Sequence, residues 1–140
     1  FCGYNMPDYW SHWFAMGDRL ATKAPAVFYV NWFRTDWDGR LLWPGFGDNS
    51  RAVQWMCDRV ANRIGADTSP IGYVPRDGDL DLAGLDISSD DIEELMEIDT
   101  GDFLRDLEDA EVYLAKFGDK VPARLRSQLE AQKSRLETAT

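Results

Sequence analysis

The sequence predicts an α+β fold that is rich in helices and has a small β-hairpin near its N-terminal end. Several stretches repeat apolar residues at the three- and four-residue spacing of one helix face, whereas residues 26–33, "AVFYVNWF", have the composition of a buried strand. At 140 residues, with 44% hydrophobic and 29% charged residues, the chain can also bury a core.

Two helices are predicted in the first half of the chain. The first covers residues 7–16, because proline suits the first turn of a helix and Gly17 suits its stop. The second begins at an N-cap of Asn49 or Ser50 and is closed by Gly65. The apolar positions of the second helix follow the spacing of one buried face: Val53, Met56, Cys57, Val60 and Ile64.

A β-hairpin is predicted between these two helices. Residues 26–33 are an unbroken run of β-branched and aromatic residues after Pro25, which is typical of a strand buried on both sides. A turn signal at Asp38-Gly39 then leads into a short strand over residues 41–43.

Three more helices are predicted in the second half. One starts at Ser88, where "SSDD" offers a capping box. The next begins after Thr100 and ends at Gly118, and the last opens at Pro122. Their apolar stripes are Phe103, Leu107, Ala110 and Leu114 on the second of the three, and Leu125, Leu129 and Leu136 on the last.

Composition divides the chain into three parts. Residues 1–65 are rich in aromatic side chains, residues 66–87 form an acidic linker, and residues 88–140 form the C-terminal helices. The chain opens on "FCGYNMPDYW" without an initiator methionine. We therefore expect all three parts to belong to one fragment of a larger domain.

The charge and the cysteine content restrict the possible partners. A net charge of −10 disfavours nucleic acid and anionic membranes as general partners, although a single nucleotide in a local pocket remains compatible with it. The sequence has no apolar run of the length that spans a bilayer. Cys2 and Cys57 are far apart, and we expect two free thiols in a reducing cytoplasm.

No catalytic or metal-binding residue is predicted. Residues 77–88 carry acids at positions 1, 3 and 5 of a calcium loop, but Leu82 stands where glycine is needed and Ser88 where glutamate is needed. A solvated acidic loop is the better interpretation. His12 is the only histidine and is expected to be a packed or surface residue. The sequence contains neither a phosphate-loop motif nor a nucleophile elbow.

One segment, "LLWPGFGDNSR" (residues 41–51), has a composition that suits a ligand, and we call it the aromatic-glycine loop. Glycine lets a backbone approach a ligand closely, and an aromatic ring beside it can stack on a planar ligand. The Asn49 amide, with a donor and an acceptor, can read the edge of a base. Alternatively, Trp43 and Phe46 are core aromatics on a tight turn, and the residues alone leave both readings open.

The segments "FCGYNMPDYWSHW" and "VNWFRTDWDGRLLWPGFGDNSR" resemble the C-terminal part of GTP-dependent phosphoenolpyruvate carboxykinase. The resemblance is strong over residues 1–64, weaker through "TSPIGYVPRDGDLDLAGLDIS", and generic in the last two helices. It implies part of the C-terminal nucleotide-binding lobe of a larger α/β enzyme. In that family the enzyme converts oxaloacetate and GTP to phosphoenolpyruvate, GDP and carbon dioxide, with manganese or magnesium, in gluconeogenesis.

The resemblance also implies a guanine site. The rings of Phe33 and Phe46 would sandwich the base, while Phe46, Gly47, Asp48 and Asn49 contact its edge and Asn49 selects guanine over adenine. Three positions depart from the family pattern: Leu41 stands where many members have a third aromatic residue, Asp48 replaces the more usual glutamate, and Cys2 stands where a phenylalanine is common.

The resemblance places the phosphate loop, the metal ligands, the arginines for the carboxylate substrates and the lid before this segment. We therefore expect the isolated chain to be inactive. The expected partners are guanine nucleotide and, in the full-length enzyme, oxaloacetate and phosphoenolpyruvate, with no nucleic acid and no membrane. We expect a monomeric parent enzyme and a self-associating isolated segment, because large exposed apolar surfaces associate.

Two other functions remain open from the residues. The first is a non-enzymatic module whose exposed aromatics bind a sugar or single-stranded nucleic acid, which the acidic charge argues against in its nucleic-acid form. The second is an acidic helical domain that binds a partner protein through Leu107 and Leu114.

Overall fold

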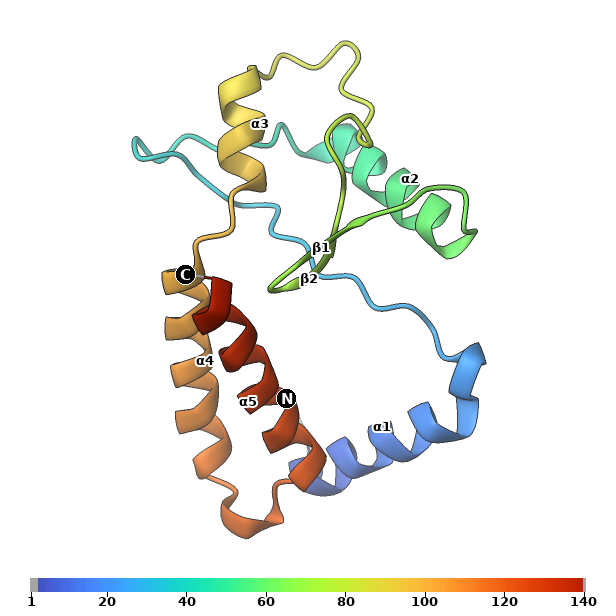
Figure 1. The fold of residues 1–140 in the computed structure, drawn as a ribbon, viewed down its shortest axis with the longest axis vertical. Coiled ribbons are helices and arrows are strands. Elements are labelled where there is room, and N and C mark those ends of the chain that lie inside the picture. Colours follow the sequence, from blue (N-terminus) through green and yellow to red (C-terminus); the bar gives the residue numbers. More distant parts are fainter. Residues whose placement is uncertain (1–2, 140) are drawn as a thin grey trace. The chain divides into compact units, whose positions relative to one another are not determined.

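The structure, a computed structural model, describes residues 3–139. Its main elements are α1 (Met6–Leu20), α2 (Asn49–Val60), β1 (Asp67–Ser69), β2 (Gly72–Val74), α3 (Ser89–Met96), α4 (Thr100–Ala115) and α5 (Ala123–Ala139) (Figure 1). Short 3₁₀ turns occur at η1 (Ala21–Lys23), η2 (Phe46–Asp48) and η3 (Gly118–Lys120). The predicted fold class, helix-rich with a small antiparallel sheet, is confirmed.

The chain forms two compact units, which we describe separately. The helical unit comprises Phe1–Pro25 and Asp99–Thr140 and contains α1, α4 and α5. The mixed unit comprises Ala26–Ile98 and contains α2, α3 and the two strands.

In the helical unit, α4 and α5 lie side by side and run in opposite directions (Figure 1). Leu136 of α5 is fully buried, and burial of such a side chain contributes about 1.5–3 kcal/mol. The other residues of the predicted stripes are half-buried: Phe103, Leu107, Ala110, Leu114, Leu125 and Leu129. The helical spacing therefore identified the packing faces of α4 and α5 correctly.

Helix α1 is longer than predicted, because it continues through Gly17 to Leu20. A glycine inside a helix costs only about 1 kcal/mol relative to alanine, which tertiary contacts can offset. Arg124 of α5 supplies such contacts, since its guanidinium lies 4.8 Å from the Phe14 ring centroid and its Nη1 lies 2.8 Å from Oδ1 of Asp18. The predicted end at Met16 is wrong.

The predicted strand over residues 26–33, which we call the apolar run, is not formed. The run has no strand assignment and is drawn as a plain tube (Figure 1). Val27 and Tyr29 are 86% and 90% exposed. A strand needs a neighbour for its N–H and C=O groups, and no described residue pairs with this run. Only the turn of the predicted hairpin remains, closed by an antiparallel bridge between Thr35 and Leu41.

The small sheet lies instead within residues 66–87, which composition marked as a linker. β1 pairs with β2 in antiparallel register, from Asp67 opposite Val74 to Ser69 opposite Gly72. Each strand has three residues, which is too short for a period-two pattern to be recognised in the sequence. Gly72 has a φ of 130°, which L-residues rarely adopt and which suits glycine at this turn.

Helix α2 also differs from its prediction in bounds and orientation. Its N-cap is Asp48, rather than Asn49 or Ser50, and it ends at Val60 well before Gly65. Trp55 is buried, with its ring 6.1 Å from that of Phe28 at an angle of 80°. An indole offers more apolar surface than the smaller side chains of the opposite face, so α2 turns this side inward.

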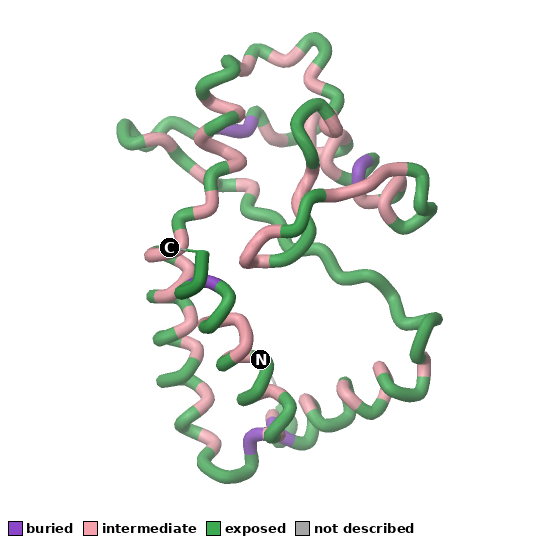
Figure 2. Tube along the Cα trace, viewed as in Figure 1, coloured by how far each residue is buried: buried purple, intermediate pink, exposed green. Residues whose placement is uncertain are grey.

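Because the Trp55 side of α2 is buried, the face that was predicted to be buried is largely exposed to solvent. Val53 is 47% exposed and Val60 is 62% exposed. The face lines a shallow hollow of about 310 Å³ formed by Val53, Met56, Cys57, Val60 and Ala61. Figure 2 shows how little of the mixed unit is buried.

The predicted starts of the last three helices are confirmed. Ser88 caps α3 through a capping box, in which its hydroxyl accepts from the Asp91 N–H at 3.0 Å and the Asp91 carboxylate accepts from the Ser88 N–H at 3.2 Å. Helix α4 begins at Thr100 with Asp99 as its N-cap, and α5 begins directly after Pro122. Helix α4 ends at Ala115, a little before the predicted stop at Gly118.

Candidate functional site: the aromatic-glycine loop

A tight turn in the mixed unit leads into the aromatic-glycine loop. The N–H of Leu42 donates to the carbonyl of Arg34 at 3.0 Å, and the N–H of Asp36 donates to the carbonyl of Arg40 at 3.0 Å. These bonds hold the chain just before Arg34 and the chain just after Leu42 at the same open end of the turn. Phe33 therefore leaves this end on one side and the aromatic-glycine loop leaves it on the other.

Two arginines of the turn attach it to the two ends of α3. Arg34 Nη1 donates to the carbonyls of Leu95 and Glu97, at 3.2 and 2.6 Å, at the C-terminal end of the helix. Carbonyls there lack intrahelical partners and favour a cation. Arg40 Nη2 lies 2.5 Å from Oδ1 of Asp91 in the first turn. The turn is thus fixed at both ends of one helix.

The Arg40–Asp91 pair has a clear electrostatic consequence. The hydrogen bond from Arg40 is the largest cause that lowers the pKa of Asp91 to about 2, and hydrogen bonds from Ser88 lower it further. The same pairing raises the pKa of Arg40. Asp91 is therefore ionised at neutral pH.

The two rings of the aromatic-glycine loop have opposite environments. Trp43 is 4% exposed, as expected for a core aromatic residue. Phe46 is 96% exposed, as expected for a ring that can stack on a ligand. Phe46 also has a φ of 48°, a region that is strained for a bulky residue. Gly45 before it has φ 79° and ψ −165°, a conformation that is essentially restricted to glycine. The backbone is thus bent so that an apolar ring points into solvent.

The polar residues after Phe46 are held in place by short-range bonds. Residues 46–48 form η2, which runs directly into α2. The Ser50 hydroxyl donates to the carbonyl of Gly47 at 2.6 Å. The indole N–H of Trp43 donates to Oδ1 of Asn49 at 3.0 Å. These two bonds fix both the backbone of the loop and the amide of Asn49.

Arg51 joins this loop to the acidic segment that follows β2. Its Nε lies 3.1 Å from Oδ1 of Asp48, while Nη1 and Nη2 donate to the carbonyls of Asp81 and Ala83 at 2.6 and 3.0 Å. Sequence reasoning missed Arg51, although the three-residue spacing from Asp48 to Arg51 on a predicted helix start was a usable signal. It also missed the bond between Trp43 and Asn49, since that bond depends on the shape of the loop.

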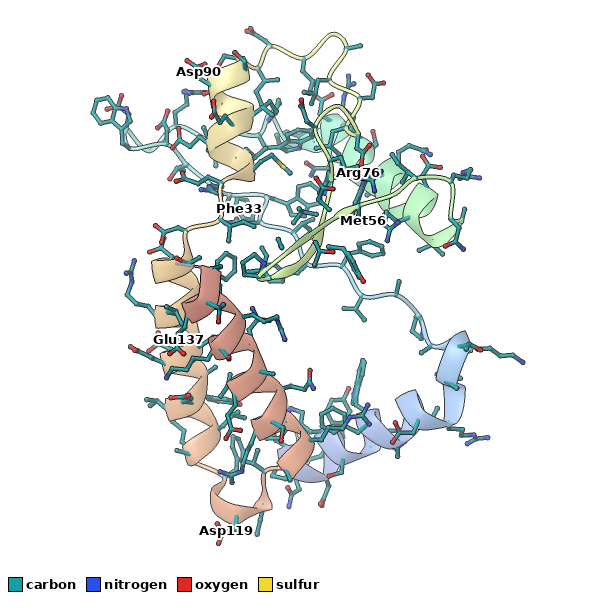
Figure 3. The ribbon with its side chains drawn as sticks, viewed as in Figure 1. Phe33, Met56, Arg76, Asp90, Asp119 and Glu137 are labelled. Atoms are coloured by element: carbon teal, nitrogen blue, oxygen red, sulfur yellow. The ribbon has the colours of Figure 1, made fainter. Side chains whose placement is uncertain are left out.

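The predicted site residues fall into two groups. Phe46, Gly47, Asp48 and Asn49 are consecutive and lie together at the start of α2. Phe33 is 77% exposed on a separate turn, where its N–H donates to Oδ1 of Asn31 at 2.9 Å (Figure 3). Among residues 3–139 no direct ring contact joins Phe33 to Phe46. Leu41 is 50% exposed at the bridge of the turn.

The other candidate groups do not form a cluster. In the described part of the chain, no three His, Cys, Asp or Glu side chains lie close enough to hold a metal ion. His12 is exposed on α1, and Asp79 and Asp81 accept hydrogen bonds from backbone N–H groups of nearby turns. Cys57 is a free, exposed thiol, and Cys2 lies outside the described residues. None of the helices within residues 3–139 has the length and apolarity to cross a bilayer.

Comparison with known proteins gives a consistent set of relatives. Residues 1–135 match the family model described as the phosphoenolpyruvate carboxykinase C-terminal P-loop domain. Proteins named phosphoenolpyruvate carboxykinase (GTP) from Corynebacterium efficiens, Corynebacterium glutamicum and Neocallimastix frontalis are 45%, 43% and 44% identical to this chain. Each alignment covers 99% of this chain and 23% of the relative, so the chain spans about a quarter of the relatives' length.

Proposed function

This chain belongs to the family of the phosphoenolpyruvate carboxykinase C-terminal P-loop domain, and from that premise we propose that its residues 46–49 bind the guanine base of a nucleotide. The site would serve a GTP-dependent phosphoenolpyruvate carboxykinase, which converts oxaloacetate and GTP to phosphoenolpyruvate, GDP and carbon dioxide. The proposal includes a cytoplasmic location for the enzyme.

The exposed ring of Phe46 is the observation that carries this proposal. An apolar ring that is 96% exposed on a positive-φ backbone costs free energy and gains nothing from the described core. A stacked base would cover the ring, and base–aromatic stacking contributes about 1–3 kcal/mol. Apart from the adjacent residues of the chain, no heavy atom lies within 4 Å of the Cβ position of Gly45 or Gly47, so the backbone on both sides of Phe46 is open to close approach by a ligand.

The remaining residues have distinct roles in this proposal. Phe33, at the open end of the turn, supplies the second ring of a sandwich around the base. The backbone of Gly47 and Asp48 approaches the base edge, because glycine permits close approach. Asn49 contacts the same edge through its amide. Leu41 is 50% exposed and stands where many family members have a third aromatic residue, so this site has one aromatic ring fewer beside the base.

In this proposal, the chemical step depends on groups outside these 140 residues. Phosphoryl transfer depends on a divalent metal and on cationic groups around the γ-phosphate. The sequence has no phosphate-loop motif, and the described residues contain no cluster that fits manganese or magnesium. We expect purified residues 1–140, mixed with oxaloacetate, GTP and manganese, to form no phosphoenolpyruvate above a blank. Clear turnover would contradict this part of the proposal.

The base site is tested by removing the exposed ring in the native polypeptide that carries these residues. Phe46→Ala is expected to weaken GDP binding by about 5- to 150-fold, the range that corresponds to one stacked base, measured by titration calorimetry. Trp37→Ala is the matched control, because Trp37 is 90% exposed on the neighbouring turn and should leave GDP binding unchanged. GDP affinity that is insensitive to Phe46→Ala would favour a module for a different ligand.

A further inference from the structure

The bond between Trp43 and Asn49 fixes which end of the Asn49 amide meets a ligand. Trp43 is 4% exposed, and its indole N–H donates to Oδ1 of Asn49 at 3.0 Å. An indole nitrogen can only donate a hydrogen bond, so the amide atom that faces it must be the oxygen. The orientation of this amide is therefore dictated by chemistry, whereas most asparagine amides must be assigned from a wider network.

The other end of the amide is available to a ligand. Asn49 is half-buried at the start of α2, and no described residue accepts a hydrogen bond from its NH₂ group. The protein therefore offers a donor at this position, while the amide oxygen is directed toward the Trp43 indole. A purine with an acceptor at position 6, such as guanine, complements this donor. Adenine presents an amino group there, which is itself a donor.

We propose that Trp43 is a positioning residue for base selectivity, because it holds Asn49 with its NH₂ group toward the ligand. This inference rests on the proposed function, in which the base lies against residues 46–49. Without the indole N–H, the amide can rotate and present its oxygen instead. The amide then accepts from the 6-amino group of adenine as readily as it donates to the 6-oxygen of guanine.

The mixed unit contains a matched control for this residue. Trp55 is also buried, at 7% exposed, and packs edge-on against Phe28. Its indole nitrogen has no hydrogen-bond partner among the described residues. Trp55→Phe therefore removes an indole of the same size without removing a hydrogen bond, whereas Trp43→Phe removes the hydrogen bond to Asn49.

The test measures dissociation constants for GDP, IDP and ADP with the native polypeptide, by titration calorimetry. Wild type is expected to prefer GDP and IDP to ADP, since both of the first two carry an oxygen at position 6. Trp43→Phe is expected to reduce the GDP-to-ADP and IDP-to-ADP preferences together, by about three- to tenfold, the range for one hydrogen bond. Trp55→Phe is expected to leave both preferences unchanged. A folded Trp43→Phe variant with wild-type preferences would overturn the inference.

A second variant keeps the test decisive if Trp43→Phe does not fold. Asn49→Asp retains an acceptor for the Trp43 indole but replaces the outward NH₂ group with an oxygen. Because GDP and ADP carry the same phosphates, repulsion by the new charge cancels in the ratio of their affinities. We expect GDP binding to fall at least threefold more than ADP binding. An equal loss for both would overturn the inference. A wild type that does not prefer GDP to ADP would instead refute the proposed guanine site itself.

Discussion

The apolar run (residues 26–33) and the aromatic-glycine loop (residues 41–51) are both rich in aromatic residues, yet they are held in different ways. In the loop, Leu42 and Trp43 are 2% and 4% exposed, and three side-chain bonds join residues three to six positions apart, while Arg51 at its end also donates to the carbonyls of Asp81 and Ala83. In the run, Val27 and Tyr29 are almost fully exposed, and no strand pairs with its backbone. The bend of the loop around Trp43 and Phe46 is held by partners close by in sequence, whereas a buried strand depends on partners far along a chain.

The largest expected effect breaks the loop at Gly45. Its φ of 79° and ψ of −165° are strained for any residue with a Cβ atom, so Gly45→Ala should lower the free energy of unfolding by about 1–3 kcal/mol. Gly47→Ala is the control, because Gly47 has no positive φ and, apart from the adjacent residues, no atom lies within 4 Å of its Cβ position. Urea denaturation measures both variants. Equal stability of the two variants would show that the backbone of the loop is not fixed as described.

An intermediate effect is expected from removing the Arg40–Asp91 pair, which attaches the turn between the two segments to α3. The pKa of Asp91 reports on this pair. Arg40→Gln should raise that pKa from about 2 toward its ordinary value, because the arginine hydrogen bond is the largest cause of the shift. Since the folded pKa is lowered, the pair stabilises the fold above the unfolded pKa of about 4, and this contribution is lost as the pH falls toward 2.

Carbon NMR titration of the Asp91 carboxyl group measures this change directly. Ser88→Ala should raise the pKa less than Arg40→Gln does, because the Ser88 hydrogen bonds are the smaller causes. A pKa that stays near 2 in the Arg40→Gln variant would mean that the turn is not attached to α3 through this pair.

The difference between the two segments also explains what could be predicted from the sequence. The capping box at Ser88, the stripe that ends in Leu136 and the turn at Asp38-Gly39 each depend on residues within a few positions, and each is present. The orientation of α2 could not be predicted, because its spacing offers two sides and the choice depends on the contact between Trp55 and Phe28, far apart in sequence.

In the candidate site, too, the sequence did not predict features that depend on the bend of the backbone or on contacts far apart in sequence. The aromatic-glycine loop was recognised from its composition. However, Trp43 is buried and Phe46 is exposed because the backbone bends at Gly45, and composition does not specify that bend. The family resemblance supplied Phe33, which the residues alone did not mark as a ligand-binding ring. The bonds of Arg51 to Asp81 and Ala83 span about thirty residues and had no local signal.

The smallest expected effect on the 140-residue chain is at Tyr29 in the apolar run. This variant distinguishes a run that stays exposed in the native polypeptide from a run that becomes a buried strand there. Tyr29 is 90% exposed, so Tyr29→Ser in the 140-residue chain should change the free energy of unfolding by about 0.5 kcal/mol or less. If the run becomes a strand in a polypeptide of the relatives' length, the same change should cost about 3–5 kcal/mol there, as expected for an aromatic side chain lost from a core. Phe28→Ala is the control, because Phe28 already packs against Trp55 and should destabilise both chains. A Tyr29→Ser effect that stays equally small in the longer polypeptide would mean that residues 26–33 are a true exposed segment, and that their strand-like composition has another purpose.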